Sequence, residues 1–241
     1  MKTLIYDIET GYNQVKAWRA GYNLVINYKD IIKERAIICI SYKWVGGKVQ
    51  HLTWDSKQSD KRMLQKFCKI IKEADQIVAH NGDKFDLRWI RGRAIKHGIE
   101  LPYDIITIDT LKWARRYFNF NSNKLDYLSQ YLEVGEKIPT GGLKLWDDVI
   151  LNKDKKALAK MVKYCDNDVL ILEKVYNKLL PYVPNKLSVT ENRIDCPECG
   201  SNNMIVSKRR IKASGAKQTQ LQCMNCGKYN TIATSIYERF N

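Results

Sequence analysis

The sequence has no long apolar run: nowhere does it approach the roughly 18 apolar residues that a membrane-spanning helix needs. Its opening segment, MKTLIYDIET, holds only a short apolar stretch that acidic residues interrupt, unlike a secretory signal peptide. Internal repeats and low-complexity tracts are also absent. These absences argue against a membrane or secreted protein, and we expect a globular protein of the cytoplasm.

Acidic residues are in short supply relative to basic ones. The chain has 26 aspartates and glutamates but 41 lysines and arginines, which gives a formal net charge of +15. A strongly basic chain favours a polyanionic partner, most often nucleic acid, because neutralising phosphates releases counterions. The same charge can serve solubility alone. With 44% hydrophobic and 28% charged residues the composition is otherwise that of a globular protein, so we expect nucleic acid, and no membrane, as the partner.

The length of 241 residues suits one full domain with a small appendage. Residues 1–182 alternate strand-like and helix-like apolar patterns, which predicts one α/β domain. Within it, residues 11–35 look irregular and predict an insertion or a substrate-facing loop. Residues 183–194 lack apolar periodicity next to prolines, as expected of a linker. A cysteine-rich unit occupies residues 195–241, so the sequence predicts two domains of unequal size.

The order of the predicted elements in residues 1–182 is informative. Strands are predicted around Leu4 and in segments 37–45 and 48–54, which the hairpin signal Gly46-Gly47 joins. A helix begins after Ser59, a candidate N-cap. Then follow a strand at 76–80, a helix ending at Gly98, a strand at 106–109, a short helix near 124–132 and a long amphipathic helix over 154–180. This order predicts an α/β fold of the ribonuclease-H-like type, with a mixed sheet flanked by helices.

The stretch YDIET places two carboxylates, Asp7 and Glu9, two residues apart on the first predicted strand. Side chains at this spacing point to the same face of a strand. Two like charges side by side repel each other unless a cation lies between them. A solvated strand end would also tolerate the pair, so other parts of the chain have to decide between the two interpretations.

Two further motifs supply polar groups later in the chain. In HNGDKFD, Asn81 and Asp86 lie where a strand turns into a helix. In YCDND, Tyr164 and Asp168 are four residues apart and share one face of the long helix. Each motif is commonplace alone, but all of them in order on the expected elements predict one acidic site.

In these motifs the sequence resembles the DEDD superfamily of 3′–5′ exonucleases, and the likeness covers residues 1–182. The histidine subgroup would need a histidine where this chain has Lys163, so the tyrosine subgroup matches better. Within that subgroup the sequence looks most like phage-encoded exonucleases and the proofreading domains of family B DNA polymerases. The resemblance implies that the catalytic residues are Asp7, Glu9, Asp86, Tyr164 and Asp168, with Thr10 and Asn81 contacting nucleic acid.

Two-metal hydrolysis of a phosphodiester would give these residues their roles. One ion activates water, and a second ion about 4 Å away stabilises the leaving oxygen. Mg²⁺ and Mn²⁺ prefer carboxylate oxygens and retained water, so we expect two such ions on Asp7, Glu9, Asp86 and Asp168. Tyr164 would orient the attacking water, because its ordinary pKa of about 10 makes it a poor base at neutral pH.

Four of the seven cysteines form two CxxC pairs, CPEC and CMNC, each followed by glycine and separated by 23 residues. Paired motifs of this kind are a strong signal for a tetrahedral metal site, and four thiolates favour Zn²⁺, with iron a minor alternative. We predict a zinc ribbon in which one structural Zn²⁺ supplies much of the folding energy. Its ligands would be Cys196, Cys199, Cys223 and Cys226, while Cys39, Cys68 and Cys165 are expected to be packed thiols.

A basic segment, SKRRIKASGAKQTQ, lies between the two CxxC pairs. It is suited to phosphate contacts, and we predict nucleic-acid binding there. A solvated loop on a structural ribbon, or a surface that docks a replication or repair protein, would also account for it. The residues concerned are Lys208, Arg209, Arg210 and Lys212.

The sequence thus predicts a metal-dependent exonuclease that releases nucleotides from the 3′ end of DNA, with single strands favoured. The likeness to phage and proofreading enzymes favours DNA, although RNA-trimming enzymes share the tyrosine motif and an exoribonuclease stays open. A structure-specific endonuclease on the same fold, and a nucleic-acid-binding recruiting protein without activity, also stay open. The intact set of four acids and the tyrosine argues against an inactive protein.

Overall fold

The computed structural model describes residues 1–21, 23–102, 105–139, 141–183 and 194–240. The chain divides into two compact units. The larger comprises Lys2–Pro102 and Thr107–Leu179, and the smaller is formed mainly by the residues from Leu180 onward. Most of the expected linker, residues 184–193, lies outside the described residues. Among the described residues, no helix is both long and apolar enough to cross a membrane.

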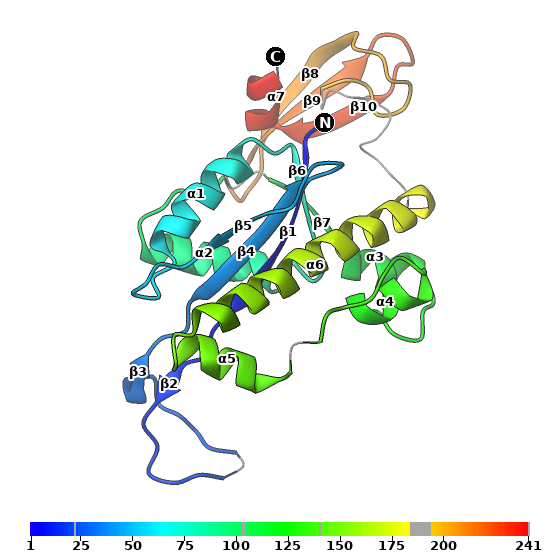
Figure 1. The fold of residues 1–241 in the computed structure, drawn as a ribbon. Helices are drawn as coiled ribbons and strands as arrows, with labels where there is room; N and C mark the ends of the chain where they lie inside the picture. The colour runs from blue at the N-terminus through cyan, green and yellow to red at the C-terminus, as the bar shows by residue number, and fades with distance from the viewer. Residues whose placement is uncertain (22, 103–104, 140, 184–193, 241) are drawn as a thin grey trace. The chain divides into compact units, whose positions relative to one another are not determined.

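A five-stranded mixed sheet forms the centre of the larger unit (Figure 1). Its strand order is β5-β4-β1-β6-β7, with β1 antiparallel to β4 and parallel to β6. β1 and β4 are buried along most of their length because both faces of the sheet are covered. The strands are β1 (Thr3–Thr10), β4 (Ile37–Trp44), β5 (Gln50–Thr53), β6 (Gln76–Ala79) and β7 (Ile106–Asp109).

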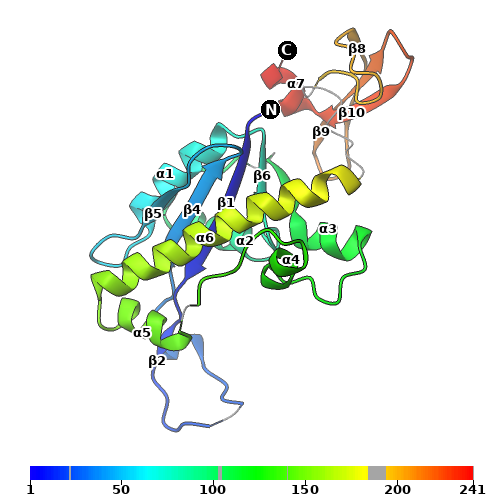
Figure 2. The ribbon, with the colours of Figure 1, turned by 45° about the vertical axis from the view of Figure 1, so that its right-hand side comes forward.

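Helices cover the two faces of this sheet (Figures 1 and 2). The Tyr6 ring on β1 lies 5.6 Å from the Phe67 ring on α1, whereas Asp7, the next residue, contacts Cys165 on α6. Because neighbouring side chains of a strand point to opposite faces, α1 and α6 lie on opposite sides of β1. The helices are α1 (Lys61–Lys72), α2 (Asp86–Lys96), α3 (Thr110–Tyr117), α4 (Leu125–Tyr131), α5 (Leu143–Ile150) and α6 (Lys155–Leu179). The predicted α/β fold with a mixed sheet flanked by helices is confirmed.

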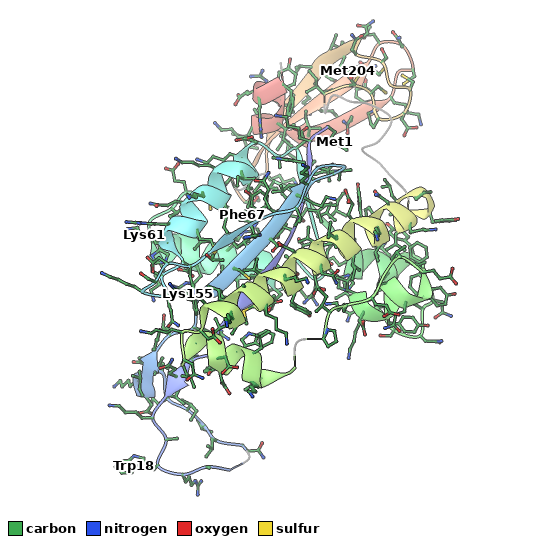
Figure 3. All side chains as sticks on the ribbon, in the orientation of Figure 1. Met1, Trp18, Lys61, Phe67, Lys155 and Met204 are labelled. Carbon is green, nitrogen blue, oxygen red and sulfur yellow. The ribbon has the colours of Figure 1, made fainter. Side chains whose placement is uncertain are left out.

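Several details differ from the sequence expectation. The N-cap of α1 is Asp60 and not Ser59, and the Asp60 carboxylate makes no capping hydrogen bond because partners on other elements hold it. The helices α3 and α5, each eight residues long, were not expected from the sequence, although both are amphipathic. Residues 11–35 are mostly irregular, as expected, but hold the short hairpin of β2 (Gln14–Val15) and β3 (Ile31–Lys33). Figure 3 shows the fully exposed Trp18 far out on this loop.

The smaller unit is a three-stranded antiparallel sheet of order β10-β9-β8 with a C-terminal helix. Its elements are β8 (Met204–Ile211), β9 (Lys217–Cys223), β10 (Tyr229–Ala233) and α7 (Thr234–Phe240). Few side chains are buried here: Leu221, Cys196, Cys223 and the Thr219–Thr234 hydroxyl pair, which is joined at 3.0 Å. So small a core leaves the unit in need of another source of stability.

Candidate functional site

Asp7 and Glu9 lie on β1 and face α6, as the two-residue spacing predicts. They pair with Ser41 and Cys39 of β4, so the site is built on the middle of the sheet and not on its edge. The register with β4 shifts directly after Glu9, where the strand leaves the sheet. Both carboxylates are half-buried, which places them at the open end of an otherwise mostly buried strand.

Asp86 is brought to the same place by the turn that joins β6 to α2. Asn81 adopts a left-handed conformation, with φ of 67°. A Cβ at Gly82 would lie 2.4 Å from the Ala79 Cβ, so only glycine fits there. The turn leaves Asp86 as the first residue of α2, only 2% exposed.

The helix α6 supplies Tyr164 and Asp168, one turn apart and on its inward face. Asp168 is only 3% exposed. Lys137, from the connection between α4 and α5, joins the two side chains: its Nζ lies 2.6 Å from Asp168 Oδ2 and 3.4 Å from the Tyr164 hydroxyl. Lys137 was not predicted from the sequence. Nothing distinguishes it locally from the other basic residues, and only the path of the chain around α6 brings it here.

The four carboxylates are close enough to disfavour one another's charge. Burial and the negative charge of Asp168 raise the pKa of Asp7 to about 7. Burial and the charges of Asp7 and Asp168 raise the pKa of Glu9 to about 9. Burial together with Asp7 raises the pKa of Asp86 well above its usual range. Burial also raises the pKa of Asp168, although the Lys137 ammonium opposes the shift.

These carboxylates fit divalent cations. Asp86 Oδ1 and Asp168 Oδ1 are buried and have no hydrogen-bond partner among the described residues. A buried oxygen of this kind is costly unless a partner satisfies it. Four carboxylates with a single nearby ammonium also leave an excess of negative charge. Oxygen ligands in this number and charge suit hard ions such as Mg²⁺ or Mn²⁺.

Tyr164 keeps its proton in this surrounding. Burial and the negative charge of Asp168 raise the pKa of its hydroxyl to about 12. At neutral pH it is therefore a hydrogen-bonding phenol and cannot serve as a base.

The remaining residues expected to contact nucleic acid lie at the edges of the acidic site. Thr10 ends β1, and its carbonyl accepts a hydrogen bond from Trp146 Nε1 at 3.0 Å. The backbone N–H of Asn81 donates to Asp109, which also caps α3. Beside them an open hollow of about 540 Å³ contains Arg115, Lys124 and Lys137, and Lys137 belongs to both the hollow and the acidic site. Asp126 also lines the hollow, but its three cations outnumber this acid and give a basic approach to the acidic centre.

His80 lines the same hollow, but both of its ring nitrogens are engaged. Nδ1 lies 2.9 Å from the Thr110 hydroxyl and Nε2 lies 3.0 Å from the Asn123 carbonyl. Burial lowers the pKa of His80 to about 4, so the ring is neutral at physiological pH. It supports the hollow structurally and does not add to its charge.

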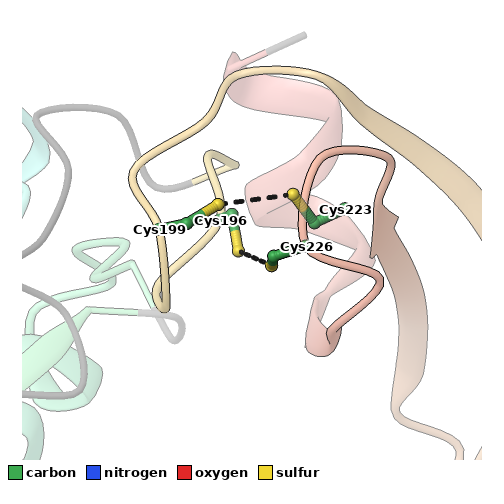
Figure 4. Close-up of side chains that lie close together, drawn as sticks. All are labelled: Cys196, Cys199, Cys223 and Cys226. Atoms are coloured by element: carbon green, nitrogen blue, oxygen red, sulfur yellow. Dashed lines mark hydrogen bonds between the residues drawn. The ribbon is translucent and has the colours of Figure 1, made fainter.

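The four cysteines of the smaller unit converge on one point (Figure 4). Their sulfurs all lie within 4.8 Å of one another, with Cys196 and Cys226 3.5 Å apart and Cys199 and Cys223 3.6 Å apart. The two CxxC turns are alike, since in each the following glycine donates its N–H to the first cysteine's carbonyl at 2.9 Å. Backbone N–H groups of the second turn, Cys226 first, lower the pKa of Cys223 to about 6. The cluster is compatible with a zinc ribbon.

The predicted basic segment forms an exposed edge of the small sheet. Lys208, Arg209 and Arg210 lie on β8, the edge strand, and Lys212 follows it directly. All four side chains are exposed. Arg209 lies over the Tyr237 ring of α7, 6.0 Å from its centre, and Arg210 Nη2 is 3.4 Å from Gln220 Oε1. The structure groups these four residues together, in a different unit from the acidic site.

Comparison with known proteins identifies relatives of the larger unit. The family model described as RNase_H superfamily matches residues 32–180. A DNA polymerase of Pyrococcus glycovorans is 36% identical over 104 residues, which are 42% of this chain and 12% of the polymerase. A DNA polymerase of Thermococcus gorgonarius is 30% identical over 102 residues, again 42% of this chain and 12% of the relative. The chain thus spans only a small part of these relatives.

A solved structure shares the fold. The family B DNA polymerase of the hyperthermophilic archaeon Pyrobaculum calidifontis superposes with a TM-score of 0.58 at 17% sequence identity. The superposition covers 75% of this chain and 24% of the polymerase.

Proposed function

The chain belongs to the RNase_H superfamily, and we propose that it is a metal-dependent nuclease of this superfamily that removes nucleotides from the 3′ end of DNA. The observation that carries the proposal is the meeting of Asp7, Glu9, Asp86 and Asp168, two of which hold a buried carboxylate oxygen without a partner among the described residues. The partial likeness to DNA polymerases supports a nuclease of this superfamily and favours DNA as the substrate.

The four carboxylates would hold two Mg²⁺ or Mn²⁺ ions. When bound, such ions supply an activated water and stabilise the oxygen that leaves the phosphorus. The carboxylates bind as anions, so metal binding displaces the protons that their raised pKa values retain. Tyr164, as a protonated phenol, orients the attacking water by a hydrogen bond. Lys137 holds Asp168 and Tyr164 in place, and its positive charge reduces the electrostatic repulsion among the carboxylates.

The DNA strand would approach from the basic hollow. Arg115 and Lys124 provide positive charge beside the acids, where the phosphates of a bound strand need it. Thr10 and Asn81, at the ends of β1 and β6, would contact the terminal nucleotide. A hollow lined by cations beside the acidic site suits the backbone of a single strand. Release from the 3′ end and the preference for single strands are both part of the proposal.

The cysteine cluster would bind one structural Zn²⁺ and present the basic β8 to nucleic acid. Four converging thiols and an exposed edge of four cations support this assignment. Docking of a replication or repair protein is the second candidate for the same surface. The corresponding domains would be a nuclease domain at 1–182, a linker at 183–194 and a ribbon at 195–241.

A cleavage assay tests the proposal directly. Single-stranded DNA and RNA of one sequence, labelled at the 5′ end, are incubated with Mg²⁺ or Mn²⁺ or with a chelator, with the 3′ end free or blocked. We expect a metal-dependent ladder that shortens from free 3′ ends, faster on DNA. Asp7→Ala should abolish cleavage and leave DNA binding intact, whereas Glu100→Ala, which changes an exposed acid outside the site, should cleave normally.

Each remaining outcome points to a different activity. Faster cleavage of RNA would make the protein an exoribonuclease, and cleavage of blocked strands an endonuclease. Binding without cleavage by the unmodified protein would point to a recruiting role. Activity retained by Asp7→Ala would overturn the assignment of the acidic site.

A further inference from the structure

Cys165 is a buried thiol that the proposed nuclease mechanism does not use. It lies on α6 directly after Tyr164, and it is 0% exposed. Its Sγ is 3.5 Å from the Asp7 carbonyl oxygen and 3.6 Å from Asp7 Oδ2. Cys68, a buried thiol elsewhere in the core, is placed differently: it lines a hollow with Gln65 and Lys69, away from the acidic site.

Asp7, Glu9 and Cys165 can share one ion. One ligand atom of each residue lies within 4.8 Å of the corresponding atoms of the other two. Two ligands on one tetrahedral zinc-sized ion lie about 3.5 Å apart, because Zn–S and Zn–O bonds are about 2.3 and 2.1 Å long. Cys165 Sγ and Asp7 Oδ2 already have this spacing, at 3.6 Å. The Glu9 oxygen, within 4.8 Å of both, would need to move by at most about 1.3 Å to join the same coordination sphere.

A second observation independently marks the place as a cation site. Asp86 Oδ1 and Asp168 Oδ1 are buried without a hydrogen-bond partner among the described residues, and both carboxylates interact electrostatically with Asp7 or Glu9. These two side chains are more than nine-tenths buried. Their unpartnered oxygens call for positive charge close to Asp7 and Glu9, the two carboxylates that lie beside the thiol.

We propose that Asp7, Glu9 and Cys165 form a binding site for a thiophilic divalent cation of the zinc class. The inference deepens the proposed function, since it concerns the same acidic site and rests on its being a cation site. On binding, the Cys165 thiol releases its proton to solvent and a sulfur–metal bond forms. Mg²⁺ leaves the thiol unused because it prefers oxygen, whereas Zn²⁺, Cd²⁺ and Co²⁺ accept sulfur.

The site then has two mutually exclusive states. With Mg²⁺ or Mn²⁺ the ligands are carboxylates, and with a zinc-class ion Cys165 joins Asp7 and Glu9. A thiophilic ion would hold Asp7 Oδ2 beside Cys165 Sγ, now 3.6 Å away, and so occupy Asp7 and Glu9, which the hard ions also need. Cys165 thereby decides which metals compete for the active site.

Cobalt absorption tests the sulfur ligand without measuring activity. The full chain first receives one equivalent of Zn²⁺, which fills the four-thiolate cluster because that cluster is the softer donor set. Co²⁺ is then added, and a thiolate-to-cobalt charge-transfer band is expected in the near ultraviolet. Cys165→Ser should lose the band and bind Co²⁺ at least about tenfold more weakly. Cys68→Ser, which also removes a buried thiol, should keep both.

An equal band in Cys165→Ser and the unmodified protein would overturn the proposal. If Cys165→Ser does not fold, cadmium NMR of the unmodified protein decides: we expect a resonance for a mixed oxygen and sulfur site beside that of the four-sulfur cluster. A four-sulfur resonance alone would refute the site. Failure of the proposed function would instead appear as a lack of cleavage with Mg²⁺. The cobalt absorption and cadmium NMR spectra would be the same in that case.

Discussion

Lys137 is the residue on which the electrostatic balance of the acidic site depends. Its ammonium lowers the pKa of Asp7, Glu9 and Asp168 by attraction, against the larger effect of burial. Burial disfavours its own charge, but Asp168 and Tyr164 more than compensate and raise the pKa of Lys137 above its usual range. Lys137 thus stays charged wherever the carboxylates titrate.

Replacing Lys137 by methionine should shift metal binding to higher pH. Without the ammonium the pKa values of Asp7 and Glu9 rise above about 7 and 9. Both carboxyl groups then lose their protons, and bind cations, only at higher pH. Affinity at high pH should not fall, because the ammonium no longer competes for Asp168. Calorimetric Mn²⁺ titrations from pH 6 to 10 measure the midpoint. Lys163→Met, an exposed lysine on α6, is the control, and equal midpoints would contradict the prediction.

At the scale of elements, Asp60 joins three of them. Its fully buried carboxylate accepts hydrogen bonds from Arg93 of α2 at 2.7 and 2.9 Å and from the Ile37 N–H of β4 at 3.1 Å. His97 Nε2 lies 2.7 Å from it. Burial alone would raise the pKa of Asp60, but these hydrogen bonds hold it below its usual range. The network fixes α2, and with it Asp86, against the sheet.

Asp60→Ala should destabilise the larger unit by about 3–5 kcal/mol, because it leaves the Arg93 guanidinium buried without its partner. Urea unfolding at neutral pH measures the loss. Glu34→Ala breaks the exposed pair with Lys96 at the end of the same helix and should cost less than about 1 kcal/mol. A similar loss in the free energy of unfolding for the two variants would show that the Asp60 network does not stabilise the unit.

At the scale of the whole molecule, the two units draw their stability from different sources. The larger has an extensive apolar core, whereas the smaller buries little beyond Leu221 and two of its cysteines. A strong zinc chelator should therefore unfold β8–β10 and leave the larger unit folded. Amide hydrogen exchange would show protection lost over residues 204–233 and kept in β1, β4 and α6. Protection that survives chelation in residues 204–233 would count against a structural metal.

The basic edge of β8 should add to the salt dependence of DNA binding. Changing Lys208, Arg209 and Arg210 to glutamine in the Asp7→Ala background should reduce the slope of log affinity against log salt by about 0.7 for each phosphate that is no longer neutralised. Changing Lys61, Arg62 and Lys66, which are exposed on α1, removes the same charge elsewhere. An equal slope in the two variants would favour protein docking at β8.

The sequence by itself determined the parts of this protein that depend on local spacing. The period of two in YDIET put Asp7 and Glu9 on one face of β1, the four-residue spacing on α6 aligned Tyr164 with Asp168, and the CxxC pairs were sufficient to bring four sulfurs together. The fold class followed from the order of the elements. Each of these inferences needs only the regular geometry of a strand, a helix or a turn.

Only the tertiary structure decided which distant residues complete the acidic site. Lys137 and Cys165 carry no local signal of a role in the site. Lys137 lies in an irregular connection, and Cys165 has the apolar spacing of an ordinary core residue of a helix. Their contacts with Asp168 and Asp7 span 31 and 158 residues of sequence. Such contacts arise when α6 packs across β1 and the preceding connection folds over it. Packing between elements is cooperative, so no spacing along the chain encodes it.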